Sequence, residues 1–456
     1  MDRIFLIILC VIGLARWLSA VKQGKRAKHL LISCFVQTLP FGYGFTLYSF
    51  MTDELLGQFG NGIRLEVPFL FFLLFSVIGY YRLPLKAFSF KSNPWFYLFV
   101  GLCFVSFFNP INPFPVSALV PLSFVTQMLL LLKVIERNFT RDQIYRGIFD
   151  GLTITITIQF FLAICYPVLG IEALASFFKG EAAMHWAERR EGYRSAVGIF
   201  THPGHLALYC LISVVFFLAN YLNHYEKKLS TAVIGMSLFV LFLTYSRTTY
   251  IVLMAVVILL WVIFRQGKGV FTFKNILIFA IGFSFLLFVF YLSPLSEMYL
   301  KSDSEEQFDN RFIHGLLGYE IWRQSKLIGI GVNSHVYYLA HKLVSDPFGG
   351  KVTMDFFTSN PIHNIHVIIA AEVGILGLLT WLSYVISKVH RLSKLCSTSN
   401  SYINIINMTF VGVLTSLFLY GFFGWSPFDT SIFGTAIFIG YFATTNTNDE
   451  KGIEVY

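Results

Sequence analysis

The chain has 456 residues, of which 56% are hydrophobic, 18% aromatic and 13% charged, and phenylalanine alone occurs 51 times. An ordinary soluble domain carries about 25% charged residues. This composition therefore excludes a water-soluble protein of this length, and it predicts an integral membrane protein with many spans. The net charge of +9 could indicate a nucleic-acid partner, but its distribution along the chain favours a different explanation.

The cysteines and the missing catalytic motifs exclude several kinds of site. Most of the six cysteines lie inside apolar runs and no two have the C-x-x-C spacing, so neither a disulfide framework nor a zinc site is expected. The chain has no P-loop, no G-x-S-x-G elbow, no H-E-x-x-H motif and no D-x-D pair. We therefore expect no cofactor, no bound metal and no use of ATP.

Spanning helices need about 20 mostly apolar residues. The first apolar segment is interrupted by Arg16, but no convincing signal-peptide cleavage site follows it, so we interpret it as a helix. The sequence predicts an all-α multi-pass bundle of about 13 transmembrane helices, with a range of 12 to 14. The predicted spans are 4–21, 29–48, 65–81, 94–109, 114–133, 147–169, 200–220, 230–245, 248–264, 275–293, 364–387, 403–422 and 430–445.

Lysine and arginine concentrate in the short loops on one side of these spans. That side holds 21 of the 34 basic residues but only 7 of the 25 acidic ones, so the positive-inside rule predicts that it is cytoplasmic. The basic charge is thus an orientation signal, and no nucleic-acid partner is expected. The opposite side receives two long polar segments, 171–199 and 294–362.

The segment 294–362 is long enough to form a small subdomain, and long connections of this kind usually carry function. Within it, the window 305–325 places Phe308, Phe312, Leu316 and Tyr319 about 3.6 residues apart. This spacing predicts an amphipathic helix that lies on the bundle or on the membrane surface.

Two arginines are candidate ligands for an anion at the membrane boundary. Arg247 lies between two apolar segments with almost no loop, at the predicted outer end of a tight helical hairpin. It could also be a snorkelling side chain that marks a helix end. Arg311 opens the predicted amphipathic helix, and it could instead pair with Asp309 or Glu306 on a solvated face. Arginine suits phosphate because its planar fork donates two hydrogen bonds and keeps its charge.

Histidines supply the candidate base. His363 and Asn364 end the long segment and precede an apolar helix, whose positive dipole end favours a neutral imidazole. A neutral imidazole can act as a general base, although a helix-capping pair is the alternative. Glu372, inside the same apolar run, should be paired, protonated or directed into a polar cavity.

His202 and His205 could suggest a pair of metal ligands. Pro203 separates them, however, and no cysteine or carboxylate cluster completes a coordination shell, so a metal site is not expected. Arg194 and His202 remain weaker candidates for contact with an anionic ligand.

The order and spacing of these pieces resemble the O-antigen ligase and polymerase family, the Wzy-C type domain of bacterial polysaccharide assembly. The resemblance runs from about Arg194 to Trp381. It comprises the Ser246-Arg247 hairpin, the long loop with Arg311, Trp322 and Gly329-Ile330-Gly331, and then His363-Asn364 followed by Glu372-Val-Gly374. It implies a GT-C-like membrane fold with one large extracytoplasmic loop.

The resemblance implies a metal-independent, inverting glycosyltransferase of the bacterial inner membrane whose active site faces the periplasm. Its donor would be an undecaprenyl-diphosphate-linked oligosaccharide. The acceptor would be a glycan in a polymerase or lipid A-core in a ligase, and a chain-length regulator is a further expected partner. By matching position, Arg247 and Arg311 would bind the diphosphate and His363 would deprotonate or hold the acceptor hydroxyl. Arg194, His202, Asn364 and Arg323 would contact donor or glycan.

Three interpretations of the activity remain open from the sequence. We favour a polymerase, because 13 predicted spans exceed the twelve of the ligase plan, and a ligase is the alternative. A transporter of lipid-linked sugar is a third possibility, although the single large loop has no counterpart in the other half of the chain. The expected division is 1–193 for N-terminal helices, 194–387 for the catalytic core and 388–456 for the C-terminal helices and tail.

Overall fold

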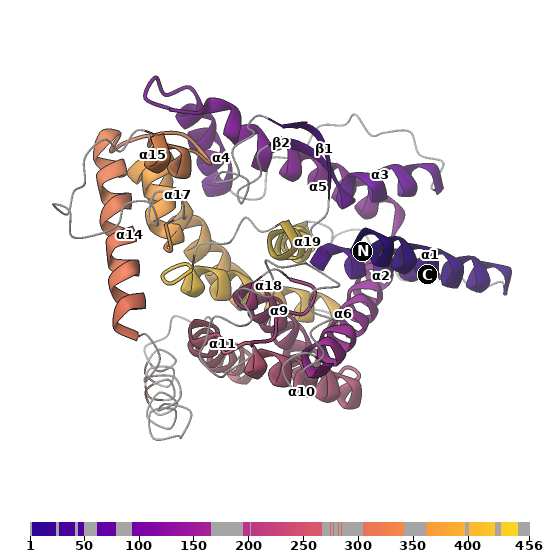
Figure 1. The fold of residues 1–456 in the computed structure, drawn as a ribbon. Helices are drawn as coiled ribbons and strands as arrows, with labels where there is room; N and C mark the ends of the chain where they lie inside the picture. The colour runs from indigo at the N-terminus through magenta and orange to yellow at the C-terminus, as the bar shows by residue number, and fades with distance from the viewer. Residues whose placement is uncertain are drawn as a thin grey trace.

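The chain folds into a helical bundle with one small β-hairpin (Figure 1), as seen in a computed structural model. The described residues are 2–23, 27–41, 44–49, 62–78, 94–165, 195–200, 202–266, 274, 277, 281, 284, 304–341, 362–396, 401–424 and 430–445.

The N-terminal part combines helices with the hairpin. Along the chain, helices α1 (Asp2–Lys22) and α2 (His29–Thr38) precede an antiparallel pair, β1 (Gly44–Ser49) and β2 (Gly62–Glu66), and α3 (Val67–Ile78) follows it. The predicted span 29–48 is therefore wrong in its second half, where a short 3-10 turn and β1 replace the helix.

Local sequence explains why the helix stops. Pro40 cannot donate an intrahelical hydrogen bond, and Gly42 and Gly44 follow it. The hairpin is fixed to α5 (Leu119–Asn138) by Gln127, whose amide oxygen accepts from the Glu66 backbone N–H at 2.8 Å. The same amide group donates to the Arg64 carbonyl at 2.7 Å, so one side chain satisfies two backbone groups of β2.

Most of the other helices occupy predicted spans. Five of the described helices are long and apolar enough to cross a membrane, at 115–138, 203–222, 247–264, 365–395 and 402–420, and shorter apolar helices accompany them. These findings fit a multi-pass membrane protein. The predicted span 275–293 lies largely outside the described residues.

The remaining helices are α4 (Pro94–Phe107), α6 (Arg141–Ala163), α9 (Pro203–Leu222), α10 (Lys227–Leu243), α11 (Arg247–Gln266), α14 (Ser304–Gln324), α15 (His335–His341), α17 (Ile365–Leu395), α18 (Ser401–Tyr420) and α19 (Thr430–Thr445).

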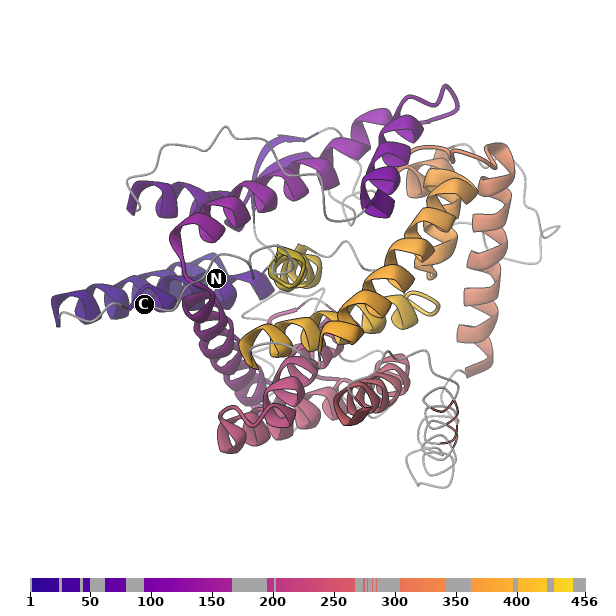
Figure 2. The same cartoon turned by 180° about the vertical axis from the view of Figure 1, so that it is seen from behind.

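Helix α9 lies at the centre of the bundle and is buried along almost its whole length, against α10, α11 and α18 (Figure 2). Gly412 of α18 lets that helix approach closely, because a Cβ atom there would lie 2.5 Å from Val215 of α9 and 3.3 Å from Leu260 of α11. The main hydrophobic core is built around these contacts.

The two ends of the bundle differ in chemistry. At one end, Tyr145 of α6 donates a hydrogen bond to Asn220 of α9, and Asn404 of α18 donates to Asn223 at 2.5 Å. Tyr145 belongs to the basic segment 133–146, and Asn223 lies four residues before the basic segment 227–228, so both basic segments lie at that end. At the opposite end, α9 and α17 begin and α18 finishes, and this is the end that carries the candidate residues.

A second buried cluster joins the long loop to α17. Its members come from α14, the turn after it, α15 and the first turns of α17: Leu317, Ile321, Ile330, Leu339, Ile362, Ile368 and Ala371. The predicted helix at 305–325 is thus confirmed as α14. The face expected to be apolar does not pack inward, however, since Phe312 is 61% and Tyr319 50% exposed while Leu317 is fully buried.

Candidate active site

The start of α17 is fixed to the end of α18. Asn364 caps α17, its side-chain oxygen accepting from the backbone N–H groups of His366 at 3.0 Å and Val367 at 3.1 Å. Its amide nitrogen donates to the Phe422 carbonyl at 3.2 Å. The Ile365 N–H donates to the Gly421 carbonyl at 2.8 Å. This junction holds His363, the residue before the cap, in a fixed position.

His363 contacts a second histidine. Its Nδ1 lies 3.4 Å from Nδ1 of His314 in α14, with the two rings edge to face and their centroids 5.0 Å apart. His314 is only 2% exposed, whereas His363 is half-buried. His314 was not among the residues that the sequence pattern indicated. Its position three residues after Arg311 on a predicted helix was the available signal, since residues at i and i+3 share a helix face.

Arg311 lies near the end of α18. Although the residue is largely exposed, withdrawal of its charged group from water lowers its pKa, and the nearby phenol of Tyr420 opposes this shift. Arginine nevertheless stays charged near neutral pH. Arg311 and His314 therefore bring a fixed positive charge and an imidazole together beside the α17–α18 junction.

His202 reaches the same place from α9. It is the N-cap of α9, and its Nδ1 accepts from the Gly204 backbone N–H at 3.0 Å. A Cβ atom at Gly204 would lie 3.2 Å from the hydroxyl of Tyr420, so α9 and α18 are in close contact at this point. The ring centroids of His202 and His205 are 5.4 Å apart. No group of three metal-ligating side chains occurs among the described residues.

Arg247 begins α11 in the tight hairpin that its sequence predicts. Only three residues separate α10 from α11, and Tyr245 adopts a left-handed conformation with φ of 52°. The hydroxyl of Tyr250 donates back to the Phe242 carbonyl at 2.8 Å and holds the turn. Arg247 is half-buried, and α11 packs against both α9 and α18, the helices that position His202 and Tyr420.

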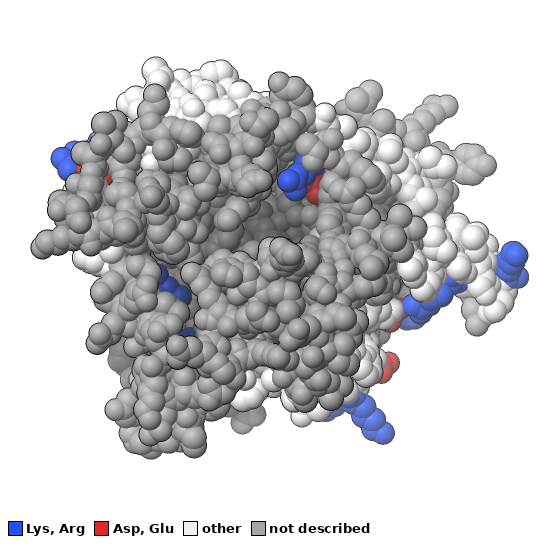
Figure 3. Space-filling model, viewed as in Figure 1, with Lys and Arg blue, Asp and Glu red and all other residues white. Residues whose placement is uncertain are grey.

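We define the helix-end cluster as Arg311, His314, His363, His366, Tyr420 and His202. His366 completes it by bonding through Nε2 to the Phe418 carbonyl at 3.0 Å. Figure 3 shows Lys and Arg side chains between the region of α14 and the region of α11. Helices α9 and α17 both begin at the cluster, and the positive ends of their dipoles favour a bound anion.

The glycine motif of the loop docks into a break in α17. Gly374 has φ of 79°, which interrupts the helix, and the loop supplies the missing hydrogen bonds. The N–H groups of Ile330 and Gly331 donate to the carbonyls of Ala371 and Glu372 at 2.9 and 3.0 Å. The close contact leaves no room for a side chain at position 374, because a Cβ atom there would lie 2.1 Å from the carbonyl oxygen of Leu327.

A buried contact between a carboxyl group and an imidazole holds this docking in place. Glu372 was expected to be paired, protonated or directed into a polar cavity, and the structure shows it paired. Its Oε1 lies 2.7 Å from Nδ1 of His335 and accepts from the His335 backbone N–H at 3.2 Å. The two side chains are 5% and 7% exposed. Asn109 fixes the same turn by donating to the Gly329 carbonyl at 2.5 Å. The turn between α14 and α15 is therefore fixed to α17, the helix that begins at the helix-end cluster.

Three predicted site residues are not linked to the cluster by described contacts. For Arg247 the structure describes only the packing of its helix, α11, on α9 and α18. Arg323 lies at the other end of α14 from Arg311, about 18 Å along the axis at 1.5 Å per residue, where it pairs with Glu320 at 3.0 Å. Arg194 lies outside the described residues.

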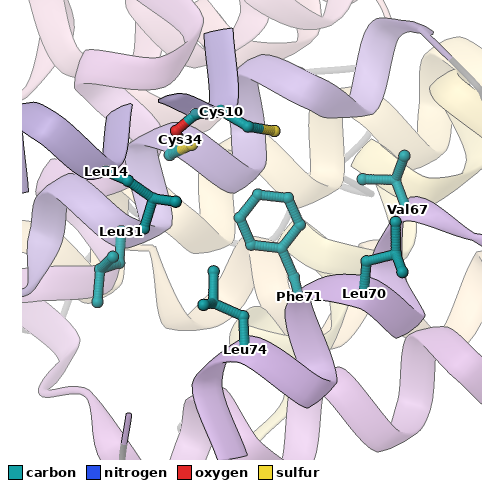
Figure 4. Close-up of a pocket in the computed structure, with 8 residues that line it drawn as sticks. All are labelled: Cys10, Leu14, Leu31, Cys34, Val67, Leu70, Phe71 and Leu74. Atoms are coloured by element: carbon teal, nitrogen blue, oxygen red, sulfur yellow. Dashed lines mark hydrogen bonds between the residues drawn. The ribbon is translucent and has the colours of Figure 1, made fainter. Parts of the chain in front are cut away.

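A small cavity of about 130 Å³ lies elsewhere, between α1, α2 and α3 (Figure 4). It is lined by leucines, Val67, Phe71 and two cysteines, Cys10 and Cys34. Its lining is almost wholly apolar, and this pocket supplies no charged group that could hold an anion.

Residues 231–382, about one third of the chain, match the family model described as O-antigen ligase. This segment is similar to O-antigen ligases. It begins later than the resemblance from residue 194 suggested, but it ends within one residue of the predicted limit. The matched segment contains Arg247, Arg311, His314, His363 and Glu372, while His202 and Tyr420 of the cluster lie outside it. A search of curated proteins found no match.

Proposed function

We propose that the protein is a glycosyltransferase that moves a glycan from undecaprenyl diphosphate to an acceptor hydroxyl. The observation that carries this proposal is the 3.4 Å contact of His363 with His314 beside Arg311, inside the segment that matches the O-antigen ligase model. The family match supports the class of substrate. The cluster supplies the two requirements of the reaction, which are positive charge for the leaving group and a base for the acceptor.

In the proposed reaction, the acceptor oxygen attacks the anomeric carbon of the donor from the side opposite the diphosphate. The bond between that carbon and the phosphate oxygen breaks, and its electron pair stays on the diphosphate. Arg247 and Arg311 stabilise this charge, and His363 takes the hydroxyl proton. The attack inverts the configuration at the anomeric carbon. Because the lipid diphosphate is already a good leaving group, the reaction needs neither ATP nor a metal ion.

Asn364, His202 and Arg194 have supporting roles in the proposal. Asn364 fixes the helix start next to His363, and we assign it a contact with the glycan. His202 and Arg194 contribute to the anionic donor site from the segment before α9. We retain Arg323 only as a contact for a distant part of the glycan, since it lies about 18 Å along α14 from Arg311.

The proposal places the site on the periplasmic face of the inner membrane. The basic segments 133–146 and 227–228 meet at the end of the bundle opposite the helix-end cluster. The positive-inside rule assigns basic loops to the cytoplasm. The cluster would then face the outer leaflet, where a lipid-linked donor is presented.

The acceptor distinguishes two versions of the proposal. We propose a polymerase, in which the acceptor is the sugar of another lipid-linked unit and a chain-length regulator is a possible partner. The support for this choice is the sequence pattern, which predicts 13 spans against the twelve of the ligase plan. A ligase acting on lipid A-core is the second candidate, because the matching family model is described as O-antigen ligase.

One experiment separates these activities from transport. Purified protein is incubated in EDTA with lipid-linked repeat units, either alone or with lipid A-core. Longer lipid-linked chains indicate the polymerase, and glycan on lipid A-core indicates the ligase. Movement of intact donor across a vesicle bilayer without any new glycosidic bond would refute the enzymatic proposal.

A further inference from the structure

The proposed reaction gives no role to His314, although this residue contacts the proposed base, His363. We propose that His314 is a positioning residue that accepts a hydrogen bond from Nδ1–H of His363 and thereby fixes the tautomer in which Nε2 of His363 carries the basic lone pair that takes the acceptor proton. This inference rests on the proposed function, since it concerns how the base is prepared.

Two neutral imidazoles can form one hydrogen bond between them only if one ring donates and the other accepts. The Nδ1–Nδ1 distance of 3.4 Å is at the long end for such a bond, and hydrogen bonds at active sites often tighten only when substrate binds. If His314 donated, His363 would carry its own proton on Nε2 and could not accept another there. The proposed role of His363 as base therefore selects the tautomer with its proton on Nδ1.

The same bond also stabilises the product of proton transfer. When Nε2 of His363 takes the hydroxyl proton, the ring becomes an imidazolium and its Nδ1–H becomes a charged donor. Hydrogen bonds from charged donors are stronger than those from neutral ones. His314 thus binds the charged form of His363 more tightly than the neutral form, which lowers the barrier to proton transfer.

The position of His314 is rigid enough for this role. It is 2% exposed, and the next turn of the same helix face carries Leu317, which is fully buried in the second hydrophobic cluster. Gly318 lets α14 lie directly against α17, because a Cβ atom there would be 2.2 Å from Val367. Val367 is one turn from His363, so the two histidines belong to one packed unit.

Other titratable and charged groups around the pair also influence it. Arg311 lies one turn before His314 on α14, His366 lies three residues after His363, and Tyr420 ends α18. A His314 variant keeps all three of these side chains, so a shift in its pH profile reports on the histidine pair.

The test measures glycan transfer by purified variants under the conditions that give wild-type activity. His314→Ala should lower kcat by about 10- to 100-fold with KM within about twofold, because the bond acts in the transition state. The acidic limb of its kcat profile should move to lower pH, since the imidazolium loses its acceptor. His314→Phe keeps a ring but removes the acceptor and should behave in the same way. His314→Asn returns an oxygen near the position of Nδ1 and should recover most of the rate.

Leu317→Ala is the matched control, because it loosens α14 on the same face without touching His363. Wild-type kcat in both His314→Ala and His314→Phe would overturn the inference, as would an equal kcat loss in Leu317→Ala. In either case wild-type transfer would leave the proposed function intact. Absence of transfer by the wild-type protein would instead remove the proposed function, and the inference with it.

Discussion

A base that acts on a sugar hydroxyl must be neutral before the reaction and charged after it. His363 is placed for this change, because it precedes the capped start of α17 and contacts the imidazole of His314. The sequence indicated His363 by its position before an apolar helix. For His314 the sequence offered only the spacing of three residues from Arg311 on a predicted helix, and this spacing does not show that His363 lies opposite in the fold.

His363→Ala should reduce kcat for glycan transfer by about 10²- to 10⁴-fold, the usual contribution of a positioned general base. Expression in the membrane should be unchanged. His390→Ala is a suitable control, since His390 lies on the same helix α17 toward its other end. Full wild-type chain length from the His363→Ala variant would remove this residue from the mechanism.

Among the helices and loops, the break in α17 and the loop that docks into it organise the site. Apolar length predicted the helices well, because a buried or lipid-facing helix needs a continuous apolar run. The same criterion failed at 29–48, where Pro40 and two glycines end the helix and a strand follows. It also could not say which face of α14 packs inward, because apolar residues occur on both faces.

Gly374→Ala should destabilise the protein markedly. Its φ of 79° is unfavourable for any side chain, and the new Cβ would lie 2.1 Å from the Leu327 carbonyl oxygen. A strained backbone conformation alone costs about 1–3 kcal/mol. Thermal unfolding of detergent-solubilised protein should therefore show a clear fall in midpoint. Gly315→Ala on α14, where a Cβ atom meets nothing within 4 Å, should be neutral or slightly stabilising. Equal midpoints for the two variants would contradict the docking of the loop into α17.

The pair of Glu372 and His335 allows a test of coupling. Removal of one partner leaves a buried polar or charged group without compensation, which typically costs about 3–5 kcal/mol. Glu372→Gln and His335→Ala should each lower the unfolding midpoint, and the double variant should lose less than the two losses combined. Purely additive losses would mean that the two residues act independently. The sequence predicted that Glu372 is paired, protonated or directed into a polar cavity. It could not choose among these, because the partner lies 37 residues away and depends on the tertiary fold.

For the molecule as a whole, the proposed reaction requires a basic end in the cytoplasm and the helix-end cluster outside. The pattern of lysine and arginine predicted this sidedness, and the structure groups two of the basic segments at one end. The convergence of α9, α14, α17 and α18 was not predictable in detail, since it depends on how helices far apart in the chain pack together.

Single cysteines in a chain whose native cysteines are replaced would test the sidedness. The two substitutions are Phe312→Cys and Lys228→Cys. Position 312 lies on the exposed face of α14, and position 228 is exposed at the basic end of the bundle. A membrane-impermeant maleimide should label position 312 in cells with a permeabilised outer membrane, and position 228 only after lysis. Labelling of both positions before lysis, or of position 228 alone, would contradict the proposed orientation.

A shared diphosphate site is tested most sharply by a double-mutant cycle on the dissociation constant of undecaprenyl diphosphate. If Arg247 and Arg311 bind the same diphosphate, Arg247→Lys and Arg311→Lys should each weaken binding by about tenfold or more, because lysine lacks the bidentate fork. Their effects should couple by about 0.5–3 kcal/mol, while Arg391→Lys at the far end of α17 should leave binding unchanged. Unchanged affinity in both single variants, or strictly additive losses, would show that the two guanidinium groups do not share one ligand.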